Sequence, residues 1–330
     1  MLPGTTLPVS NVTFNELTSR WGKLQWFRAL CDPKGLVPCC YNNVCTSRPK
    51  EDCKCPYCYD MRQPLHAELA TWVPNDPTCK MTRFDTVEDT CRLLQNMTIF
   101  MFGDSLVRHI YIALLNILRQ GTAHGVLKKT ASPASVTRCD ADFVHLGRCM
   151  GDIDADTWEC NNTVRLLFRE HSYIVQTNLT LKFVAELIGR PNSVVFVGNG
   201  IHDDYNYPEA ANKVLLPLIR NLSSSPWPKL VWSAVHAPGL LKTPRVPSQS
   251  RESVVIYNKQ LRSILEAHHV PVFDTFQLTD GVESFDGVHY GRGVNGVKAQ
   301  ILLNYLLQLR SNGEFPLERT PNLRPEIKIS

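Results

Sequence analysis

From Met97 onward, short apolar runs alternate with longer amphipathic runs, and this alternation constrains the fold more than any other feature of the sequence. The short runs are rich in β-branched and aromatic residues, which is typical of buried strands, whereas the longer runs repeat apolar residues at helical spacing. Strands are expected at Thr98–Phe102, Val164–Arg169, Ser193–Val197, Leu230–Ala234 and Val270–Asp274. Helices are expected at Leu106–Arg119, Leu179–Ile188, Glu209–Asn221, Glu252–His268 and Asn295–Arg310, and Tyr173–Gln176 is interpreted as an additional strand or hairpin partner.

This order predicts an α/β fold, a three-layer sandwich in which helices cover both faces of a mostly parallel five-stranded sheet. The chain has 330 residues, 43% of them hydrophobic and 20% charged, so it can bury a core of that size. We expect residues 96–315 to form this main domain and residues 316–330 to form a C-terminal tail. Residues 121–162 are the least regular part of the domain and are interpreted as a disulfide-tied insertion. Ligands of such folds bind at the carboxyl ends of the strands.

Residues 1–95 have a different character, because eight of the twelve cysteines lie between Cys31 and Cys79 among many prolines. An even number of cysteines in a Pro-rich segment favours disulfides, which form in an oxidising compartment. We expect an irregular, disulfide-rich N-terminal cap packed on the main domain, with Trp72 and Phe84 as anchors. The alternative is a zinc site at Cys53-Lys-Cys55-Pro-Tyr-Cys58. The cysteines expected in disulfides, with unknown pairing, are Cys31, Cys39, Cys40, Cys45, Cys53, Cys55, Cys58, Cys79, Cys91, Cys139, Cys149 and Cys160.

Five sequons also point to the secretory pathway, and the protein is expected in the Golgi lumen or outside the cell. The segment Met1–Arg20 is polar and lacks the apolar core of a signal peptide. No stretch reaches the roughly 20 apolar residues that span a bilayer. A membrane anchor would therefore lie outside this chain. The candidate glycosylation sites are Asn11, Asn96, Asn161, Asn178 and Asn221.

A tight turn, Gly103-Asp104-Ser105, separates the first predicted strand from the first predicted helix. Glycine permits the sharp turn, and the turn leaves the Ser105 hydroxyl at the sheet edge beside the positive end of the helix. Ser105 could simply cap the helix. It could also act as a nucleophile if a base and oxyanion donors lie nearby. Asp104 is expected to stabilise the turn by accepting backbone N–H hydrogen bonds.

A candidate base lies near the other end of the domain, in a glycine-rich loop. Asp286 and His289 are three residues apart, so on one helical turn they face the same side. The carboxylate can then hold one ring nitrogen of the histidine while the other nitrogen faces a nucleophile. An isolated Asp-x-x-His is common. Together with Gly103-Asp104-Ser105 at the opposite end of an α/β pattern, it indicates a Ser-His-Asp triad.

These two motifs resemble the first and last sequence blocks of the SGNH, or GDSL-like, hydrolase superfamily. The chain is also similar to the PC-esterase group, which includes the trichome-birefringence-like polysaccharide O-acetyltransferases and the luminal domain of the sialic-acid O-acetyltransferase. The likeness covers about residues 30 to 310. Its motifs here are Trp72-Val-Pro74, Cys79, Arg83-Phe-Asp85 and Gly103-Asp104-Ser105-Leu-Val-Arg108. One departure is His289-Tyr290, where the plant enzymes carry histidine and tryptophan.

The resemblance implies that Ser105 is the nucleophile, His289 the base and Asp286 the residue that orients the base. It also implies oxyanion donors: the Ser105 backbone N–H and Asn199, although the spacing around Gly198-Asn199-Gly200 departs from the family pattern. Asn199 could instead have a plain turn role. The glycine of the second family block could be Gly147 or Gly151.

Other polar residues near the predicted strand ends have two interpretations each. Arg108 could contact an anionic substrate or form a salt bridge, and Tyr205 could line a sugar cleft or be an ordinary loop aromatic. His236 could bind substrate, but we favour a structural or rim role. The remaining candidates are His109, interpreted as structural, Tyr207, interpreted like Tyr205, and His202 with Asp203, a rival His/Asp pair.

The sequence therefore predicts serine-dependent acyl transfer on glycans, with a glycan or polysaccharide acceptor and an acetyl donor. We favour an O-acetyltransferase. A carbohydrate O-acetyl esterase is the alternative, as is a non-catalytic secreted binding protein on the same fold. This chemistry requires no cofactor and no metal. Nucleic acid is not expected as a partner, because the formal net charge is only +4 and no basic run interleaves with aromatics.

Overall fold

The protein is described from a computed structural model. The structure describes residues 78–120, 125–139, 147–239, 246–282, 284 and 286–315, together with positions 36, 39–41, 44–47 and 68. Most of the predicted N-terminal cap, including Trp72 and the Cys53–Cys58 segment, lies outside the described residues, as does the tail at 316–330. The described part of the cap contains one antiparallel pair of short strands, β1 (Cys39–Tyr41) and β2 (Val44–Thr46).

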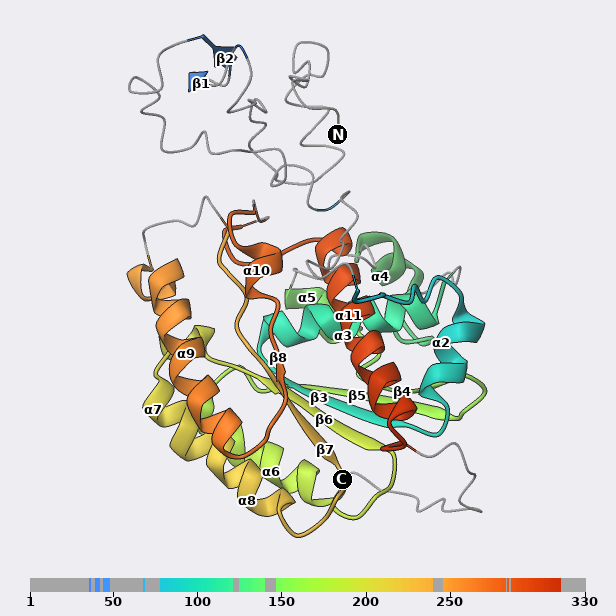
Figure 1. The fold of residues 1–330 in the computed structure, drawn as a ribbon. Coiled ribbons are helices and arrows are strands. Elements are labelled where there is room, and N and C mark those ends of the chain that lie inside the picture. Colours follow the sequence, from blue (N-terminus) through green and yellow to red (C-terminus); the bar gives the residue numbers. More distant parts are fainter. Residues whose placement is uncertain are drawn as a thin grey trace.

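The main domain has the predicted α/β fold, built on a mixed sheet of six strands in the order β4-β5-β3-β6-β7-β8 (Figure 1). The predicted strands all exist, but the edge strand β4 was not predicted. It runs antiparallel to β5, whereas the other neighbouring pairs are parallel. The strands are β3 (Thr98–Gly103), β4 (Asp156–Glu159), β5 (Val164–Glu170), β6 (Ser193–Gly198), β7 (Lys229–Ser233) and β8 (Val272–Phe273).

Helices cover both faces of this sheet, so the three-layer prediction is confirmed (Figure 1). One face packs against α2 (Val87–Leu94), α3 (Ser105–Leu118) and α11 (Arg292–Ser311). The other face packs against α6 (Thr177–Ala185), α8 (Leu216–Leu222) and α9 (Arg251–Ala267). All six residues of β3 and of β6 are buried, because a central strand between two helical layers has no solvent face.

Several short helices complete the domain. The segment Tyr173–Gln176, interpreted as a strand, is instead a 3₁₀ turn, η4 (Ile174–Gln176), because its backbone bonds locally rather than to a neighbouring strand. The predicted helix at 209–221 starts earlier and contains a π-helical segment. The short helices are α4 (Pro133–Arg138), α5 (Gly147–Met150), η5 (Ile201–Asp203), α7 (Tyr207–Glu209), η6 (Ala210–Leu215), η7 (Pro247–Gln249) and α10 (Phe276–Thr279).

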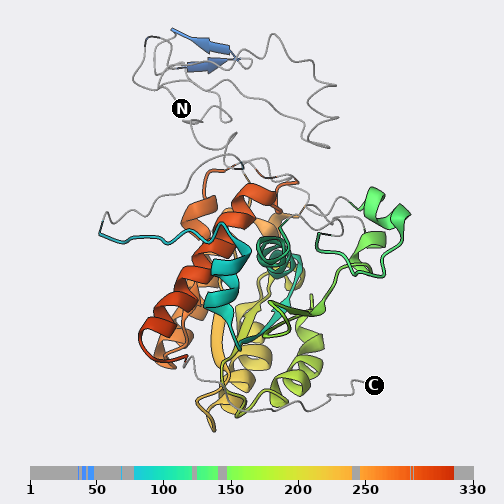
Figure 2. The same cartoon turned by 90° about the vertical axis from the view of Figure 1, so that its right-hand side faces the viewer.

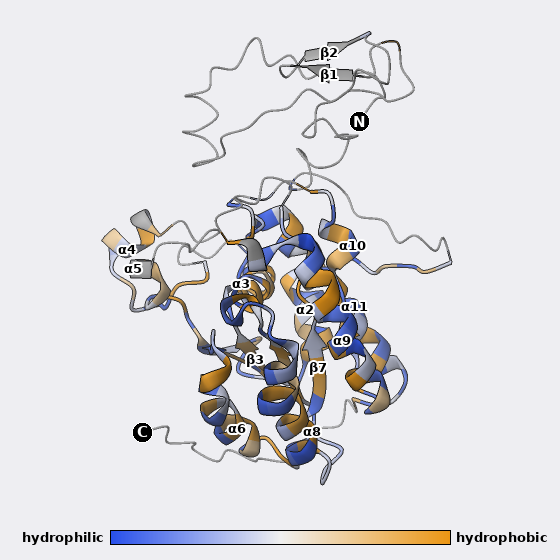
Figure 3. Cartoon of the chain, turned by 90° about the vertical axis from the view of Figure 1, so that its left-hand side faces the viewer, coloured by the Kyte–Doolittle hydropathy of each residue, from blue (hydrophilic) through white to orange (hydrophobic). Residues whose placement is uncertain are grey.

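The described residues contain two disulfides that involve the insertion. Cys139–Cys149 closes a short loop within it, and Cys91–Cys160 joins its end to α2. The insertion carries α4 and α5, which project beside the sheet in the two side views (Figures 2 and 3). Cross-links of this kind stabilise mainly by restricting the unfolded chain. They favour a secreted or lumenal protein.

The segment before α2 lies along α11 through side-chain amides. Gln300 exchanges two hydrogen bonds with the backbone of Phe84, and Asn304 does the same with Thr82. Phe84 is buried in the core. Cys79, predicted to be in a disulfide, is instead an exposed free thiol, because the disulfides of the described residues pair Cys91 with Cys160 and Cys139 with Cys149. None of the described helices has the length and apolar character needed to cross a membrane.

Candidate active site

Ser105 is the first residue of α3, directly after β3. The turn requires glycine at position 103, where φ is +154° and an added Cβ would lie 1.9 Å from the Gly198 carbonyl oxygen. Asp104 is the N-cap residue, since its Oδ1 accepts the Leu106 N–H at 2.9 Å. The capping role considered for Ser105 therefore belongs to Asp104, and the Ser105 hydroxyl is available for other contacts.

The fold brings Ser105, His289 and Asp286 into one hydrogen-bonded chain, although 184 positions separate the first two. His289 Nε2 lies 2.7 Å from Ser105 Oγ, and His289 Nδ1 lies 2.7 Å from Asp286 Oδ2. Because an ionised carboxylate only accepts, Nδ1 carries the proton and the lone pair of Nε2 can accept the serine proton. This arrangement matches the nucleophile, base and orienting acid of a catalytic triad.

The loop that carries the last two members is stabilised by Asp286 itself. Its Oδ1 accepts the backbone N–H groups of Val288 at 2.9 Å and His289 at 2.8 Å. Burial alone would raise the pKa of Asp286, but the hydrogen bond and charge of His289, with these two N–H groups, hold that pKa well below its usual range. Asp286 is therefore ionised at neutral pH and keeps His289 in one tautomer. The ring of buried His109 packs 5.0 Å from the ring of His289.

Asn199 follows β6 at the same sheet edge. Gly198 pairs with Gly103 in the parallel ladder, so Asn199 lies across from Asp104 and next to the turn Gly103-Asp104-Ser105. The Tyr257 hydroxyl donates to the Asn199 backbone oxygen at 3.0 Å and lies 3.3 Å from its Oδ1. With Oδ1 facing Tyr257, the side-chain amide N–H groups remain for another acceptor. The Ser105 N–H is in the first turn of α3, where helices leave N–H groups without intrahelical acceptors.

Replacement of Asn199 by alanine is expected to lower the turnover of an acetyl ester by about 10²-fold to 10³-fold, because one oxyanion donor is lost. The Michaelis constant should change little, since the donor acts on charge that develops in the transition state. Steady-state kinetics with p-nitrophenyl acetate would measure both constants. A variant with unchanged turnover would leave Asn199 with the plain turn role.

The two glycines considered for the second family block lie elsewhere. Gly147 begins α5 and Gly151 follows it, within the insertion. An added Cβ at Gly151 would meet nothing within 4 Å. The segment that adjoins the Gly103 turn next to β3 is the end of β5. Its last residue, Glu170, pairs with Gly103, and the next residue, His171, donates its N–H to the Gly103 oxygen at 2.8 Å.

Arg108 lies one turn beyond Ser105, and its side chain is buried. Its guanidinium is ion-paired with Glu170 at 2.6 Å, and it also contacts the Met150 sulfur. The structural interpretation therefore accounts for Arg108, because its charge is already compensated.

The other candidates divide between the interior and the rim. Tyr205 and His236 are buried, whereas His202 is exposed and its ring lies 5.3 Å from that of Tyr173. Asp203 accepts the Ile174 N–H at 2.9 Å instead of hydrogen bonding to His202. Tyr207, on α7, is 36% exposed. The structure does not bring His202 and Asp203 together as a second His/Asp pair.

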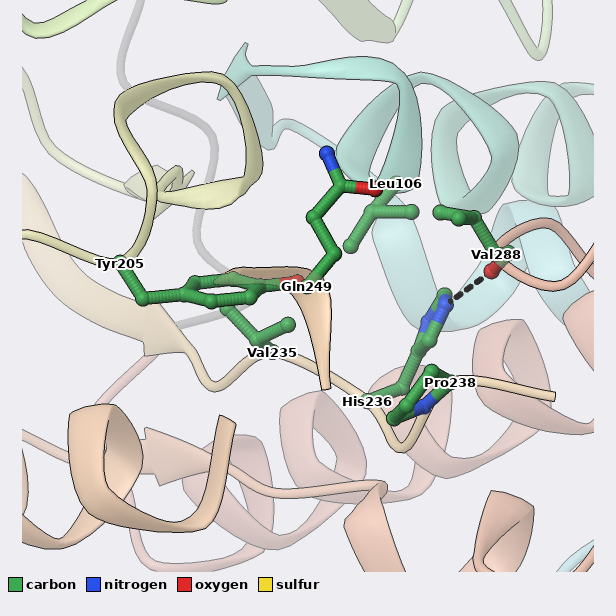
Figure 4. Close-up of a pocket in the computed structure, with 7 residues that line it drawn as sticks. All are labelled: Leu106, Tyr205, Val235, His236, Pro238, Gln249 and Val288. Atoms are coloured by element: carbon green, nitrogen blue, oxygen red, sulfur yellow. Dashed lines mark hydrogen bonds between the residues drawn. The ribbon is translucent and has the colours of Figure 1, made fainter. Parts of the chain in front are cut away.

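A small pocket is lined partly by residues that adjoin Ser105 and His289 in the chain (Figure 4). Two of the residues that line it, Leu106 and Val288, directly follow Ser105 and directly precede His289, respectively. Its other lining residues are Tyr205, Val235, His236, Pro238 and Gln249.

Asp104 is buried, and its Oδ2 has no hydrogen-bond partner among the described residues. Burial raises the pKa of Asp104 from 3.8 to about 6, although the Leu106 N–H and the charges of His202 and His289 oppose the shift. The folded state therefore holds this proton more tightly than the unfolded chain does. It follows that ionisation of Asp104 destabilises the fold fully above pH 6, and that this penalty disappears as the pH falls below about 4.

The substitution Asp104→Asn keeps a good N-cap residue and removes the buried charge. It is expected to raise the free energy of unfolding at pH 7.5 by up to about 3 kcal/mol and to change it little at pH 4. Urea denaturation at the two pH values would measure the difference. An equal effect at both would show that the charge is not the cause.

Three residues that contact the surroundings of this site were not identified from the sequence: Tyr257, which bonds to Asn199, Lys298, whose Nζ lies 2.6 Å from His236 Nδ1, and Glu68. Tyr257 occupies a core position of an amphipathic helix, where an aromatic residue carries no functional signal. Lys298 did leave a signal, because it interrupts the apolar stripe Val294, Lys298, Leu302 at helical spacing. The carboxylate of Glu68 accepts the N–H groups of Gly291 at 2.6 Å and Val294 at 3.0 Å, a contact that no local pattern predicts.

No protein-family model matches the chain, and no curated protein matches it. Similar solved structures include Est24, a carbohydrate acetylesterase from Sinorhizobium meliloti, with a TM-score of 0.37 and 12% identity over 64% of this chain and 99% of that one. An acetylxylan esterase from Geobacillus stearothermophilus, Axe2, gives 0.35 and 13% over 64% and 94%. A member of the lipolytic G-D-S-L family from Veillonella parvula gives 0.36 and 15% over 63% and 98%.

Proposed function

We propose that this protein is a serine-dependent O-acetyltransferase of glycans. The observation that carries the proposal is the continuous hydrogen-bonded chain from Ser105 through His289 to Asp286. A protein that used the fold only for binding would have no need to keep three such groups aligned. The resemblance of its motifs to the PC-esterase group supports transfer to a sugar hydroxyl. The disulfides support an oxidising compartment, and we propose that the protein acts in the Golgi lumen or outside the cell.

In the first half-reaction, Ser105 Oγ attacks the carbonyl carbon of an acetyl donor while His289 Nε2 takes the serine proton. The Ser105 N–H and the Asn199 amide stabilise the oxyanion of the tetrahedral intermediate. The bond to the leaving group then breaks, and His289 returns the proton to that group. The acetyl group remains on Ser105 as an ester. Asp286 stays ionised and stabilises the imidazolium that forms between the two proton transfers.

The second half-reaction uses the same groups in reverse. A sugar hydroxyl attacks the acetyl carbon, His289 takes its proton, and Ser105 leaves with the proton returned. Water in place of the sugar gives hydrolysis, so a carbohydrate esterase is the alternative function. Transfer dominates only if the site positions the acceptor and excludes water.

The experiment that separates the two functions supplies an acetylated donor with and without an oligosaccharide acceptor. We expect the acceptor to become acetylated and the release of free acetate to fall when the acceptor is present. Acetate release that does not respond to any acceptor would support the esterase. If neither reaction occurs and a fluorophosphonate probe does not label Ser105, the protein is not an enzyme of this class.

A further inference from the structure

Among the described residues, Lys298 is the charged residue that is most completely buried. It lies on the inner face of α11 with no exposed surface. Lysines are almost never fully buried, because the ammonium group loses its hydration. Its Nζ lies 2.6 Å from Nδ1 of His236 and 5.2 Å from the centre of the Tyr290 ring. Such a cost indicates that the amine has a task at this place.

His236 connects this lysine to the active-site loop. It follows β7, and its Nε2 lies 2.7 Å from the carbonyl oxygen of Val288, the bond drawn in Figure 4. A carbonyl oxygen can only accept, so Nε2 carries the ring proton. Nδ1 of the neutral ring is then an acceptor, and Lys298 is its donor. Each hydrogen bond thus determines the direction of the next, from Lys298 through His236 to Val288.

Val288 immediately precedes His289. Its N–H is held by Asp286 and its carbonyl by His236, so the peptide units leading into the catalytic histidine are held on both sides. Tyr290, the residue after His289, is also held, because its hydroxyl donates to the Ala237 oxygen at 2.8 Å. The ring of Tyr290 packs edge-on against His236 at 4.9 Å.

The charges around Lys298 and His236 agree with the donor and acceptor roles in these hydrogen bonds. Burial and the charge of Lys298 lower the pKa of His236 well below its usual range, which keeps the ring neutral. Burial also lowers the pKa of Lys298 to about 7, and the charge of Glu68 opposes this shift. Glu68 binds the backbone at the start of α11, where the helix dipole favours an anion.

We propose that Lys298 and His236 are positioning residues, which hold the Val288 carbonyl and thereby keep the His289 ring within hydrogen-bonding distance of Ser105. Neither acts on the reacting atoms. The inference rests on the proposed function, because it assigns His289 the role of base. It explains why a fold accepts a buried amine directly behind that loop.

Four variants test the assignment. His236→Phe fills the space but removes both hydrogen bonds, and Lys298→Met removes the donor. His236→Gln can still donate to Val288 and accept from Lys298. Lys213→Met, which replaces an exposed lysine of η6 paired with Glu209, is the matched control. Turnover and the Michaelis constant are measured with p-nitrophenyl acetate, and folding by thermal denaturation.

We expect His236→Phe and Lys298→Met to lower turnover about tenfold to a hundredfold with little change in the Michaelis constant, because a small misplacement of a catalytic group has this cost. His236→Gln should restore most of the turnover, and Lys213→Met should match the wild type. The downfield proton resonance of His289 Nδ1–H, bonded to Asp286, should be present in the wild type and lost or broadened in His236→Phe.

Two results would overturn the inference: a folded His236→Phe or Lys298→Met with wild-type turnover, or a folded His236→Gln as slow as His236→Phe. Should His236→Phe fail to fold, the glutamine and methionine variants still decide. A wild type without any esterase or labelling activity would refute the proposed function instead. In that event the proton resonance tests the positioning by itself, and an unaltered resonance in His236→Phe would refute the inference too.

Discussion

Replacement of Ser105 by alanine is expected to lower the turnover of an acetyl ester by about 10⁴-fold to 10⁶-fold. The hydroxyl that accepts the acetyl group is lost, and water bound near His289 cannot replace an aligned nucleophile. The fold should be unaffected, because Asp104 rather than Ser105 caps α3. Labelling with a serine-reactive fluorophosphonate, followed by gel fluorescence and peptide mass spectrometry, measures the same loss directly.

The matched control for this prediction is Ser263→Ala, which replaces an exposed serine on α9 whose hydroxyl donates to the local backbone oxygen of Gln260. It should label like the wild type. If Ser105→Ala labels as strongly as the control, the nucleophile is another residue. The triad geometry would then have no catalytic meaning.

The second large effect is expected from Asp286→Asn, which should lower turnover by about 10⁴-fold. An asparagine can still accept the N–H groups of Val288 and His289, so the loop should keep its shape. It cannot stabilise the imidazolium. Its amide also presents a donor to Nδ1, which favours the wrong ring tautomer with the proton on Nε2 facing Ser105. Steady-state kinetics from pH 6 to pH 9 would show a low turnover throughout, because no pH in this range restores the missing charge.

The control for Asp286→Asn is a carboxylate outside the triad, that of Asp280. Asp280 forms an ion pair with Arg251 at the surface, and Asp280→Asn should change turnover little, since surface pairs of this kind contribute at most about 1 kcal/mol. Should Asp286→Asn retain turnover within about tenfold of the wild type, the carboxylate orients the ring without contributing its charge. The proposed mechanism would then need a different source of imidazolium stabilisation.

The central strands were predictable because each carries its own signal. β3 and β6 are continuous apolar runs that end in glycine, and both lie within one residue of the predicted bounds. Strand β4 carried no such signal, since Asp156–Glu159 is short and mostly polar. It is a strand only because β5 offers it an edge to pair with. The same dependence on neighbours explains Tyr173–Gln176, whose residues suit a strand but pair with no strand among the described residues.

The residues of the site also fall into those that the sequence predicts and those that depend on distant neighbours. Ser105, Asp286 and His289 were identified as partners because parallel topology collects strand ends at one edge and because a carboxylate and an imidazole three residues apart share a face. The buried ion pair of Arg108 was not predictable, because its partner Glu170 lies at the end of β5, far from α3 in the sequence. The disulfide partners Cys91 and Cys160 were likewise not predictable from spacing. Whether Asn199 presents its amide N–H groups to the site depends on Tyr257, which a separate helix supplies.

By itself, the sequence determined the layered α/β fold and the identity of the three groups proposed for catalysis, since apolar periodicity and turn chemistry are local properties of the chain. Only the tertiary structure decided the distance between Ser105 and His289, the support of Asn199 by Tyr257, and the hydrogen bonds behind Val288. Those features depend on contacts between residues far apart in the chain. Their energies arise when desolvated polar groups must find partners, and no local pattern records which partner is found.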